Sequence, residues 1–540
     1  MTAPATNESR PERRTDLDAL RGFAMALGIV LHACLSFVPS PWPVQDREQS
    51  NWFILVYAVI HCFRMPLFFI LSGFFTMFMF RRYGLGGMLR QRALRILLPL
   101  ALAIVTIVPV SNMLYRLASE TTRVSPGAHD PMVEAILRND APAAAELWRQ
   151  RGAGWVDPVH SRDALNWAAI AGHPEMVELL LGKGAEINAR SAADGETALH
   201  AAALFANDEA VAVLLAAGAD PLARDEQGRT ARQKSIAMAK SIAHTAQILG
   251  LPEPDEREVA LRRDHSDNLL ARASANVSGR TLADVIDSGA LWYNRLLVSD
   301  YFGFAVGGQY FQVFSTKVFD HLWFLWVLVW LVLGFAAAVK LGFAPTGRRL
   351  WLLPVLTLLP QWLMTGIGPD TWLGLLPPPH LVLYYACFFW FGAAVFARDG
   401  MATRMGSHWK FLLPVGLLVL LPASFATLGD RLTSTFVQAA TAWVVALGAI
   451  GIFHRYCSSL GPKTRWLSDA SYWMYLAHLP LVVAVQLAIY DRPWPVWGKF
   501  LLVNAVVALA LLASYRWFIR YTWVGTMLNG SRQRPVPQGS

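Results

Sequence analysis

Charged residues are scarce in this chain of 540 residues, where they make up only 16% of the sequence. Soluble domains carry roughly 25% charged residues, so the composition excludes a chain built from water-soluble domains alone. Hydrophobic residues reach 54%, and the chain contains 21 Trp and 29 Phe residues. Because Trp and Tyr favour the membrane–water interface, this composition predicts an integral membrane protein.

Cysteine is also rare, and none of the four cysteines belongs to a Cys-x-x-Cys pair. This spacing predicts neither a disulfide framework nor a zinc site. The sequence also lacks His, Cys and Asp clusters with metal-ligand spacing and lacks a glycine-rich phosphate loop. We therefore expect no metal and no tightly bound cofactor. The formal charge of +9 does not indicate nucleic acid as a partner, because the basic residues lie mostly in short loops between apolar runs.

Long apolar runs are the main positive feature of the sequence. A membrane-spanning helix needs about 20 mostly apolar residues, and ten runs are candidates. They are residues 17–38, 52–80, 94–114, 319–340, 350–366, 380–397, 411–428, 433–454, 469–490 and 498–519. Some are short or carry proline, as the fifth does with Pro354 and Pro360. The pattern predicts an all-α fold, a polytopic membrane bundle of about ten transmembrane helices.

Basic residues alternate between the two sets of loops that join these runs. One set contains Arg14, Arg81, Arg82, Arg90, Arg348, Arg349, Arg404, Arg465 and Arg520. The opposite set holds little beyond Arg47, Arg431, Arg492 and Lys499. Because cytoplasmic loops carry the excess of Lys and Arg, we expect a multi-pass protein of the inner, or cytoplasmic, membrane with both termini cytoplasmic.

The stretch from about residue 117 to residue 299 interrupts the apolar pattern, because it is polar, charged and rich in alanine. It contains a repeat with an offset of 34 residues. Leu165-Asn-Trp-Ala-Ala matches Leu199-His-Ala-Ala-Ala, and Gly184-Ala-Glu matches Gly218-Ala-Asp. Such a period indicates stacked helical units that bury one another's apolar faces.

The segment Thr197-Ala-Leu-His-Ala-Ala, together with this period, resembles ankyrin repeats. A degenerate unit around Leu147 and Gly152 precedes it, and a partial unit at Gly228 follows it. The glycine before alanine in each unit predicts a left-handed turn that ends the second helix. We expect an ankyrin-repeat α-solenoid inserted between the third and fourth transmembrane helices, on the extracytoplasmic side.

Four regions follow from these patterns. They are residues 1–116 with the first three transmembrane helices, 117–250 with the ankyrin repeats, 251–300 as a linker, and 301–540 with the remaining helices. The linker is charged and is expected to be helical over part of its length.

Arg21 and His32 lie in the first apolar run, eleven residues apart. An arginine at the middle of a transmembrane helix costs about 2.5–3.5 kcal/mol. Eleven residues make three turns plus about 20°, so both side chains project from one face, about 16 Å apart along the axis. Arg21 is suited to hold an anionic donor near the cytoplasm, and His32 is suited to proton transfer deeper in the membrane.

A simpler interpretation makes Arg21 a positive-inside anchor paired with Asp18, and His32 a satisfied interior polar residue. For Arg21 alone the two interpretations are equally supported. For the pair on one face we favour a functional role.

These residues resemble a known family. Arg21, ten residues and His32 fit the Arg-x10-His motif of the membrane acyltransferase-3 family. The resemblance covers all ten runs in order, with the strongest motifs in the first four, and further similar segments lie at the second, third, fourth and ninth runs. They are Phe63-Arg64-Met-Pro, Ser72-Gly-Phe, Arg92-Ala-Leu-Arg95, His321-Leu-Trp323-Phe-Leu and Tyr475-Leu-Ala-His478. Several of these look most like the glucan biosynthesis protein C branch, which is associated with succinylation of periplasmic glucans. The ankyrin insert departs from the usual form of the family and leaves the substrate open.

The resemblance implies transfer of an acyl group, acetyl or succinyl, from cytoplasmic acyl-CoA to a hydroxyl of an extracytoplasmic glycan or cell-envelope polysaccharide. It implies His32 and Arg21 as catalytic residues, with His32 taking the hydroxyl proton, and Arg64, Arg92 and Arg95 as donor-binding residues. Further residues that line the site in this interpretation are Asp18, His61, His321, Trp323 and His478. The expected partners are the lipid bilayer, acyl-CoA, the glycan and a protein bound through the ankyrin repeats.

Simpler roles compete with several of these assignments. Arg92 and Arg95 also fit loop charges that orient the helices, and His478 fits a core histidine bonded to a neighbouring helix. No Gly-x-Ser-x-Gly frames Ser72, so we interpret Ser72-Gly73 as a site of close helix packing.

Two other classes of protein also fit the sequence. One is a transporter or flippase, although no internal symmetry of two halves is visible. The other is a scaffold whose ankyrin surface binds a partner.

Overall fold

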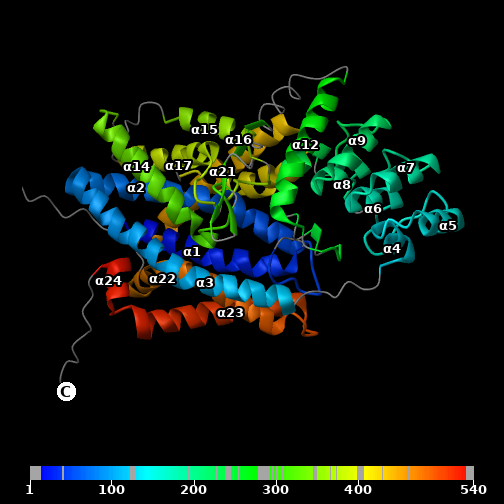
Figure 1. The fold of residues 1–540 in the computed structure, drawn as a ribbon. Coiled ribbons are helices and arrows are strands. Elements are labelled where there is room, and N and C mark those ends of the chain that lie inside the picture. Colours follow the sequence, from blue (N-terminus) through cyan, green and yellow to red (C-terminus); the bar gives the residue numbers. More distant parts are fainter. Residues whose placement is uncertain are drawn as a thin grey trace, which may run out of the picture.

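A bundle of long helices carries a smaller helical domain at one end in the computed structural model of this protein (Figure 1). The structure describes residues 14–38, 42–121, 129–237 except 193 and 227, 249–277 except 253, 302–343 except 307, 308 and 315, 350–397 except 365 and 373, 407–458 except 429, and 461–530, with a few isolated positions between 242 and 297.

The first part of the bundle is a nearly continuous series of helices. It consists of α1 (Thr15–Cys34), the 3₁₀ turn η1 (Leu35–Phe37), α2 (Trp52–Arg92), the π-helical turn η2 (Ala93–Leu97) and α3 (Leu98–Thr121). Gly84 breaks α2 with a φ of 67°, a conformation that glycine adopts without steric cost. The break separates the second predicted transmembrane run from the third.

The second part of the bundle follows the insert. It consists of the 3₁₀ turn η4 (Asp320–Leu322), α14 (Trp323–Lys340), α15 (Leu352–Leu356), α16 (Leu358–Trp362), α17 (Pro379–Ala397), α19 (Trp409–Pro414), the π-helical turn η6 (Val415–Leu420), α20 (Leu421–Ala426), α21 (Arg431–Cys457), α22 (Pro462–Ile489), α23 (Val496–Ser514), the π-helical turn η7 (Tyr515–Ile519) and α24 (Trp523–Asn529).

Eight helical segments of the described chain are long and apolar enough to cross a membrane. One of them, Trp52–Thr121, has 70 residues and contains both the second and the third predicted run. The predicted run 350–366 differs, because it forms only the short apolar segment Leu352–Trp362. Each of its two five-residue helices contains a proline, and proline removes a helical hydrogen bond, so the expectation of one continuous helix there is corrected.

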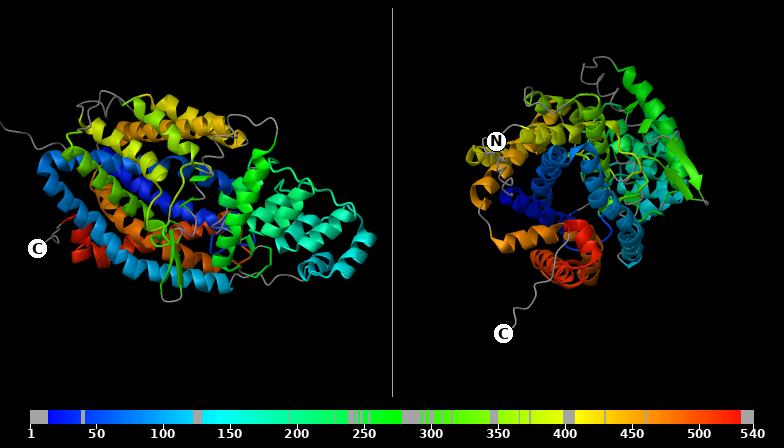
Figure 2. Two further views of the ribbon diagram at one scale, coloured as in Figure 1. Left: turned by 45° about the horizontal axis from the view of Figure 1, so that its top comes forward. Right: turned by 90° about the vertical axis from the view of Figure 1, so that its left-hand side faces the viewer.

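Helix α1 lies inside the bundle, where it packs against α2, α21, α22 and α23. Figures 1 and 2 show it enclosed by neighbouring helices of the bundle. Leu20 and Ala24 of α1 are fully buried. The helix with the sharpest sequence signal is therefore surrounded by protein on most of its circumference.

Helices α2 and α17 approach each other closely through two glycines. A Cβ atom on Gly73 would lie 1.8 Å from the carbonyl oxygen of Phe389, and one on Gly392 would lie 1.9 Å from that of Ile70. Small residues allow such backbone contact between membrane helices. The interpretation of Ser72-Gly73 as a packing site is confirmed.

The inserted domain is a stack of paired short helices. They are α4 (Pro131–Leu137), α5 (Ala141–Arg151), α6 (Ala164–Ala171), α7 (Pro174–Gly182), α8 (Ala198–Leu204), α9 (Asp208–Ala216) and α10 (Ala231–Ala237). Gly184 and Gly218 have φ values of 90° and 97°, as the predicted left-handed turns require. Helix α4 begins the degenerate first unit, and α10 belongs to the partial last one.

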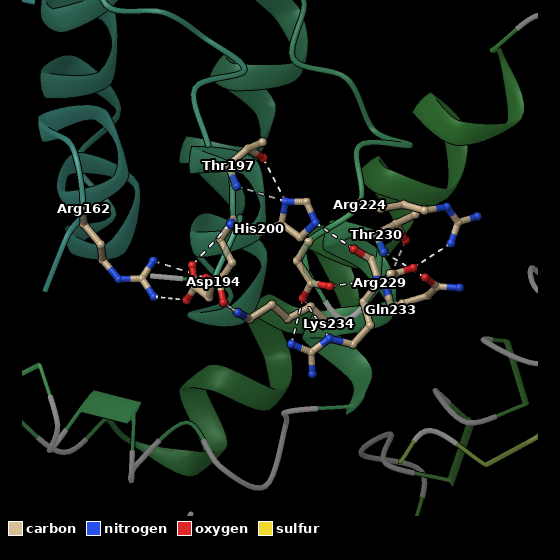
Figure 3. A network of polar contacts seen from close by, with 12 residues as sticks. Arg162, Asp194, Thr197, His200, Arg224, Arg229, Thr230, Gln233 and Lys234 are labelled. Atoms are coloured by element: carbon tan, nitrogen blue, oxygen red, sulfur yellow. Dashed lines mark hydrogen bonds and ion pairs between the residues drawn. The ribbon is translucent and has the colours of Figure 1, made fainter. Parts of the chain in front are cut away.

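Side chains of the ankyrin signature connect neighbouring units. His200 Nδ1 lies 2.9 Å from Thr197 Oγ1 at the start of α8, and His200 Nε2 donates to the carbonyl oxygen of Arg229 in the next unit at 2.9 Å. Figure 3 shows this network together with Arg162, which pairs with Asp194 at 2.7 Å. The signature residues thus cap one helix and join it to the next repeat.

Helix α12 (Glu256–Ala275) covers the end of the repeat stack. It packs against α8, α9 and α10, and Arg232 of α10 pairs with Asp267 of α12 at 2.7 Å. Leu270 is fully buried in the core of the repeats. The sequence predicted a helical linker here, and the structure shows that its helix also packs on the ankyrin domain.

The chain leaves and re-enters the bundle at neighbouring points. The hydroxyl of Tyr115 in α3 donates to the carboxylate of Asp320 in η4 at 2.9 Å. A small antiparallel hairpin, β1 (Gly303–Val306) paired with β2 (Gln309–Gln312), precedes η4. The all-α fold with an inserted ankyrin domain is confirmed, and this hairpin is a local addition to it.

Candidate active site

Arg21 and His32 both face helix α22. Arg21 Nη2 donates to Ser468 Oγ at 3.2 Å, and the rings of His32 and His478 lie 5.1 Å apart between centroids. Ser468 and His478 both belong to α22. The two α1 side chains therefore lie along one helix–helix interface, as their spacing predicts.

Three histidines from three elements form a row within the bundle. His478 lies between His32 and His321, and its ring centroid is 5.0 Å from that of His321. His321 and His478 are buried, with exposed fractions of 6% and 1%. His32 is half-buried. The structure thus brings together residues that lie far apart in the sequence.

Arg64 of α2 reaches the same place because α1 has a glycine there. A Cβ atom on Gly28 would lie 2.6 Å from Arg64 Nη1 and 3.8 Å from His478 Nε2. Any side chain at position 28 would therefore displace the guanidinium. His32, Arg64, His321 and His478 form what we call the histidine cluster.

A loop after α1 lies against His32. The indole of Trp42 stacks on the His32 ring with centroids 5.4 Å apart and donates to Gln486 Oε1 at 2.7 Å. Gln486 Nε2 in turn donates to the carbonyl oxygen of His32 at 3.2 Å. Asp46 of the loop forms a buried ion pair with Lys499 of α23 at 2.9 Å. These contacts hold the loop and the end of α1 in place.

Three arginines gather nearer the beginning of α1. Arg92 and Arg95 interact electrostatically with Arg21 and with Tyr472. The hydroxyl of Tyr472 donates to the carbonyl oxygen of Arg95 at 2.6 Å. Asp18 lies 3.7 Å from Arg21. The predicted donor-binding residues Arg92 and Arg95 thus group with Arg21, whereas Arg64 belongs to the histidine cluster.

Arg92 and Arg95 differ in their surroundings. Arg92 Nη2 donates to the carbonyl oxygen of Ser72 at 3.1 Å and to Thr76 Oγ1 at 2.6 Å. Arg95 is exposed. Arg92 therefore stabilises the fold of α2 in addition to contributing positive charge, while Arg95 is accessible to a bound anion.

His61 and Trp323 lie outside the histidine cluster as the contacts define it. His61 stacks on Tyr57 at 4.9 Å and lies against Gly368. Trp323 packs on Tyr385 at 5.7 Å. Their positions fit packing roles beside the site.

Sequence reasoning missed Trp42 and Gln486. Gln486 lies within the ninth apolar run, and a polar residue within a membrane span is a signal for an interior position. Trp42 carries no comparable signal, because its position next to His32 depends on the path of a loop.

The fold and the site define a multi-pass membrane protein with a polar cluster inside its helix bundle. Residues 14–127 match the sequence model of a family described as "Acyltransferase domain", and residues 127–231 match one described as "Ankyrin repeats (3 copies)". The chain therefore carries an acyltransferase-3 domain match over its first three predicted transmembrane runs, followed by inserted ankyrin repeats.

Curated relatives match part of the chain. Proteins named "Glucans biosynthesis protein C" from Escherichia coli strains SMS-3-5 / SECEC, K12 and O1:K1 / APEC are each 38% identical to it over 93 residues. This stretch covers 17% of the chain and 24% of each relative, so the chain spans about a quarter of the length of these proteins.

Proposed function

We propose that this protein is a membrane acyltransferase that moves an acyl group, acetyl or succinyl, from acyl-CoA to a hydroxyl of a glycan. Acyl-CoA approaches from the cytoplasm, and the glycan, a component of the cell envelope, is modified on the opposite side. The relatives named for glucan biosynthesis and the match to an acyltransferase domain support this assignment.

In the proposed reaction the acceptor hydroxyl attacks the thioester carbonyl of acyl-CoA. His32 takes the hydroxyl proton, a new C–O ester bond forms and the C–S bond breaks. The proton then passes from His32 to the leaving thiolate, which departs as free CoA thiol. All atoms balance, and no other reactant is required.

The arginines near the start of α1 and the histidine cluster are proposed to bind the two ends of acyl-CoA. Phosphate groups of CoA are suited to Arg21 and Arg95, because guanidinium binds phosphate by paired hydrogen bonds. Arg21 and His32 are about 16 Å apart along α1, and the long pantetheine arm of CoA can place the thioester beside His32. Arg64, which belongs to the histidine cluster, is proposed to donate to the carbonyl oxygen as negative charge develops on it.

One observation carries the proposal: His32 belongs to a cluster within the bundle that also contains two further histidines and an arginine. A solely structural histidine needs no such surroundings. Polar and charged groups inside a membrane domain are costly and mark functional sites.

The test compares His32→Ala with the unaltered protein reconstituted in lipid. We expect acyl transfer from acyl-CoA to glycan, followed by mass spectrometry, to fall at least about 100-fold. His454→Gln is the matched control, because His454 lies outside the cluster and contacts Asp16. Normal transfer by a correctly folded His32→Ala protein would refute the mechanism, and glycan flux without acyl donor would instead favour a transporter.

The ankyrin repeats are proposed to bind a protein partner or the glycan. They lie at the end of the bundle opposite to α24, as Figures 1 and 2 show. Because α12 packs on the repeats, a clean deletion should remove residues 129–277 together. Retained transfer by the deletion variant would make the repeats an accessory, and its loss in a folded bundle would favour a scaffold that organises the reaction.

A further inference from the structure

Hydrogen bonds determine which nitrogen of two cluster histidines carries the proton. His478 Nδ1 lies 2.7 Å from the carbonyl oxygen of Tyr475, and His321 Nε2 lies 3.0 Å from that of Leu476. A carbonyl oxygen only accepts hydrogen bonds, so each of these nitrogens donates. In the neutral rings, the opposite nitrogens, His478 Nε2 and His321 Nδ1, therefore carry lone pairs.

Both lone-pair nitrogens are buried, and neither has a hydrogen-bond partner among the described residues. His32 Nδ1 and Arg64 Nε share this property. The Asp320 carboxylate lies 3.9 Å from His321 Nδ1 and accepts a hydrogen bond from the Tyr115 hydroxyl. Leaving a buried acceptor unpaired is unfavourable, so the cluster is suited to a ligand that supplies hydrogen-bond donors.

A structural role explains only one of the two ring nitrogens of His478 and of His321. The bonds to Tyr475 and Leu476 explain one nitrogen of His478 and one of His321. His321 bonds to the neighbouring helix α22, whereas His478 bonds to a carbonyl oxygen of its own helix and not, as predicted from the sequence, to a neighbouring one. These bonds leave the nitrogens on the other side of each ring unexplained. A metal ion does not fit, since no suitable group of His, Cys, Asp or Glu occurs in the described part of the chain.

Resting on the proposed function, we infer that His478 Nε2 and His321 Nδ1 accept hydrogen bonds from hydroxyl groups next to the one that His32 deprotonates. Lone pairs attract O–H donors and repel the oxygens of carboxylates and phosphates. Arg64 adds a donor for a hydroxyl oxygen. The site thereby selects a neutral polyhydroxylated acceptor, such as a sugar ring with neighbouring hydroxyls, over a simple alcohol.

The test measures transfer by the full-length protein to two probes, a glucose oligosaccharide and propanol. We expect His478→Leu and His321→Leu to raise KM for the oligosaccharide about tenfold each. KM for acyl-CoA should change less than about twofold, and the slow transfer to propanol should fall less than transfer to the oligosaccharide, because neither acyl-CoA nor propanol uses the flanking acceptors. His478→Gln supplies a carbonyl acceptor and should restore most of the oligosaccharide affinity, whereas a role in packing alone predicts no such rescue.

Two outcomes overturn the inference. Unchanged oligosaccharide KM in folded His478→Leu and His321→Leu proteins would show that the nitrogens are unpaired or bonded to water only. An equal loss with oligosaccharide and propanol would assign them a general role in the fold.

Failure of the proposed acyltransferase function can be distinguished from failure of the inferred subsite. If the unaltered protein transfers no acyl group, binding of the oligosaccharide is measured directly by calorimetry. Weaker binding by His478→Leu than by the His454→Gln control would then still support the subsite, and equal binding would refute it.

Discussion

His32 and His478 stand ring to ring, with centroids 5.1 Å apart, although they belong to the first helix of the chain and to α22. This contact joins α1 and α22 at the level of Gly28, where the Arg64 side chain also lies. Substitutions that alter this geometry without breaking the bundle are the most informative tests of the site.

Gly28→Ala tests whether the position of Arg64 matters for activity. The new Cβ would lie 2.6 Å from Arg64 Nη1, at the far end of a flexible side chain. The guanidinium should move while the fold persists, and a small displacement at a reacting centre costs up to about 100-fold in rate. We expect kcat to fall about 10- to 100-fold with little change in melting temperature.

The control for Gly28→Ala is Gly334→Ala in α14, where a Cβ meets no atom within 4 Å. Unaltered kcat in a folded Gly28→Ala protein would exclude Arg64 from the chemistry.

Arg95→Gln and Arg92→Gln should separate donor binding from stability. Arg95 is exposed, so its substitution should raise KM for acyl-CoA about tenfold at unchanged thermal stability. Arg92 also donates hydrogen bonds to Ser72 and Thr76, so its substitution should lower the melting temperature as well. Steady-state kinetics and thermal unfolding measure both effects, with Arg455→Gln as a charge-matched control. Equal KM values for Arg95→Gln and this control would argue for a topological role.

Gly73→Ala should disrupt the contact between α2 and α17. Its Cβ would lie 1.8 Å from a backbone oxygen, and backbone moves less readily than a side chain. Overpacking costs about 1–3 kcal/mol in well-packed cores, and separation of two membrane helices should reach at least this range. Thermal unfolding in detergent measures the loss. A melting temperature equal to that of Gly334→Ala would contradict the observed packing.

The ankyrin domain should lose stability in mild acid through His200. Burial lowers the pKa of His200 below its ordinary value of 6.5, so the folded domain binds fewer protons than the unfolded one. Its stability is therefore retained above pH 6.5 and declines as the pH falls below that value. Protonation would also remove the acceptor that faces Thr197.

Limited proteolysis of the full-length protein near neutral pH and at about pH 5.5 checks this dependence. Cleavage within the repeats should accelerate in acid, and His200→Asn should reduce the difference between the two conditions. An identical pH dependence for both proteins would show that other groups control it.

Much of the architecture follows from local patterns in the sequence. The apolar runs predict most of the membrane helices, because a span is set by length and composition. The repeat of 34 residues predicts the ankyrin units, and the Thr197-to-His200 cap lies within one turn. The spacing of Arg21 and His32 predicts their common face from helix periodicity alone.

Tertiary structure decided which of the candidate residues meet. His32, Arg64, His321 and His478 converge because four separate elements cross, and the room for Arg64 depends on a glycine of another helix. Trp42 reaches His32 through a loop, and α12 covers the repeats through long-range packing. Periodicity along one helix carries no information about the rotation of its neighbours, so the sequence alone determined the elements and the packing determined the site.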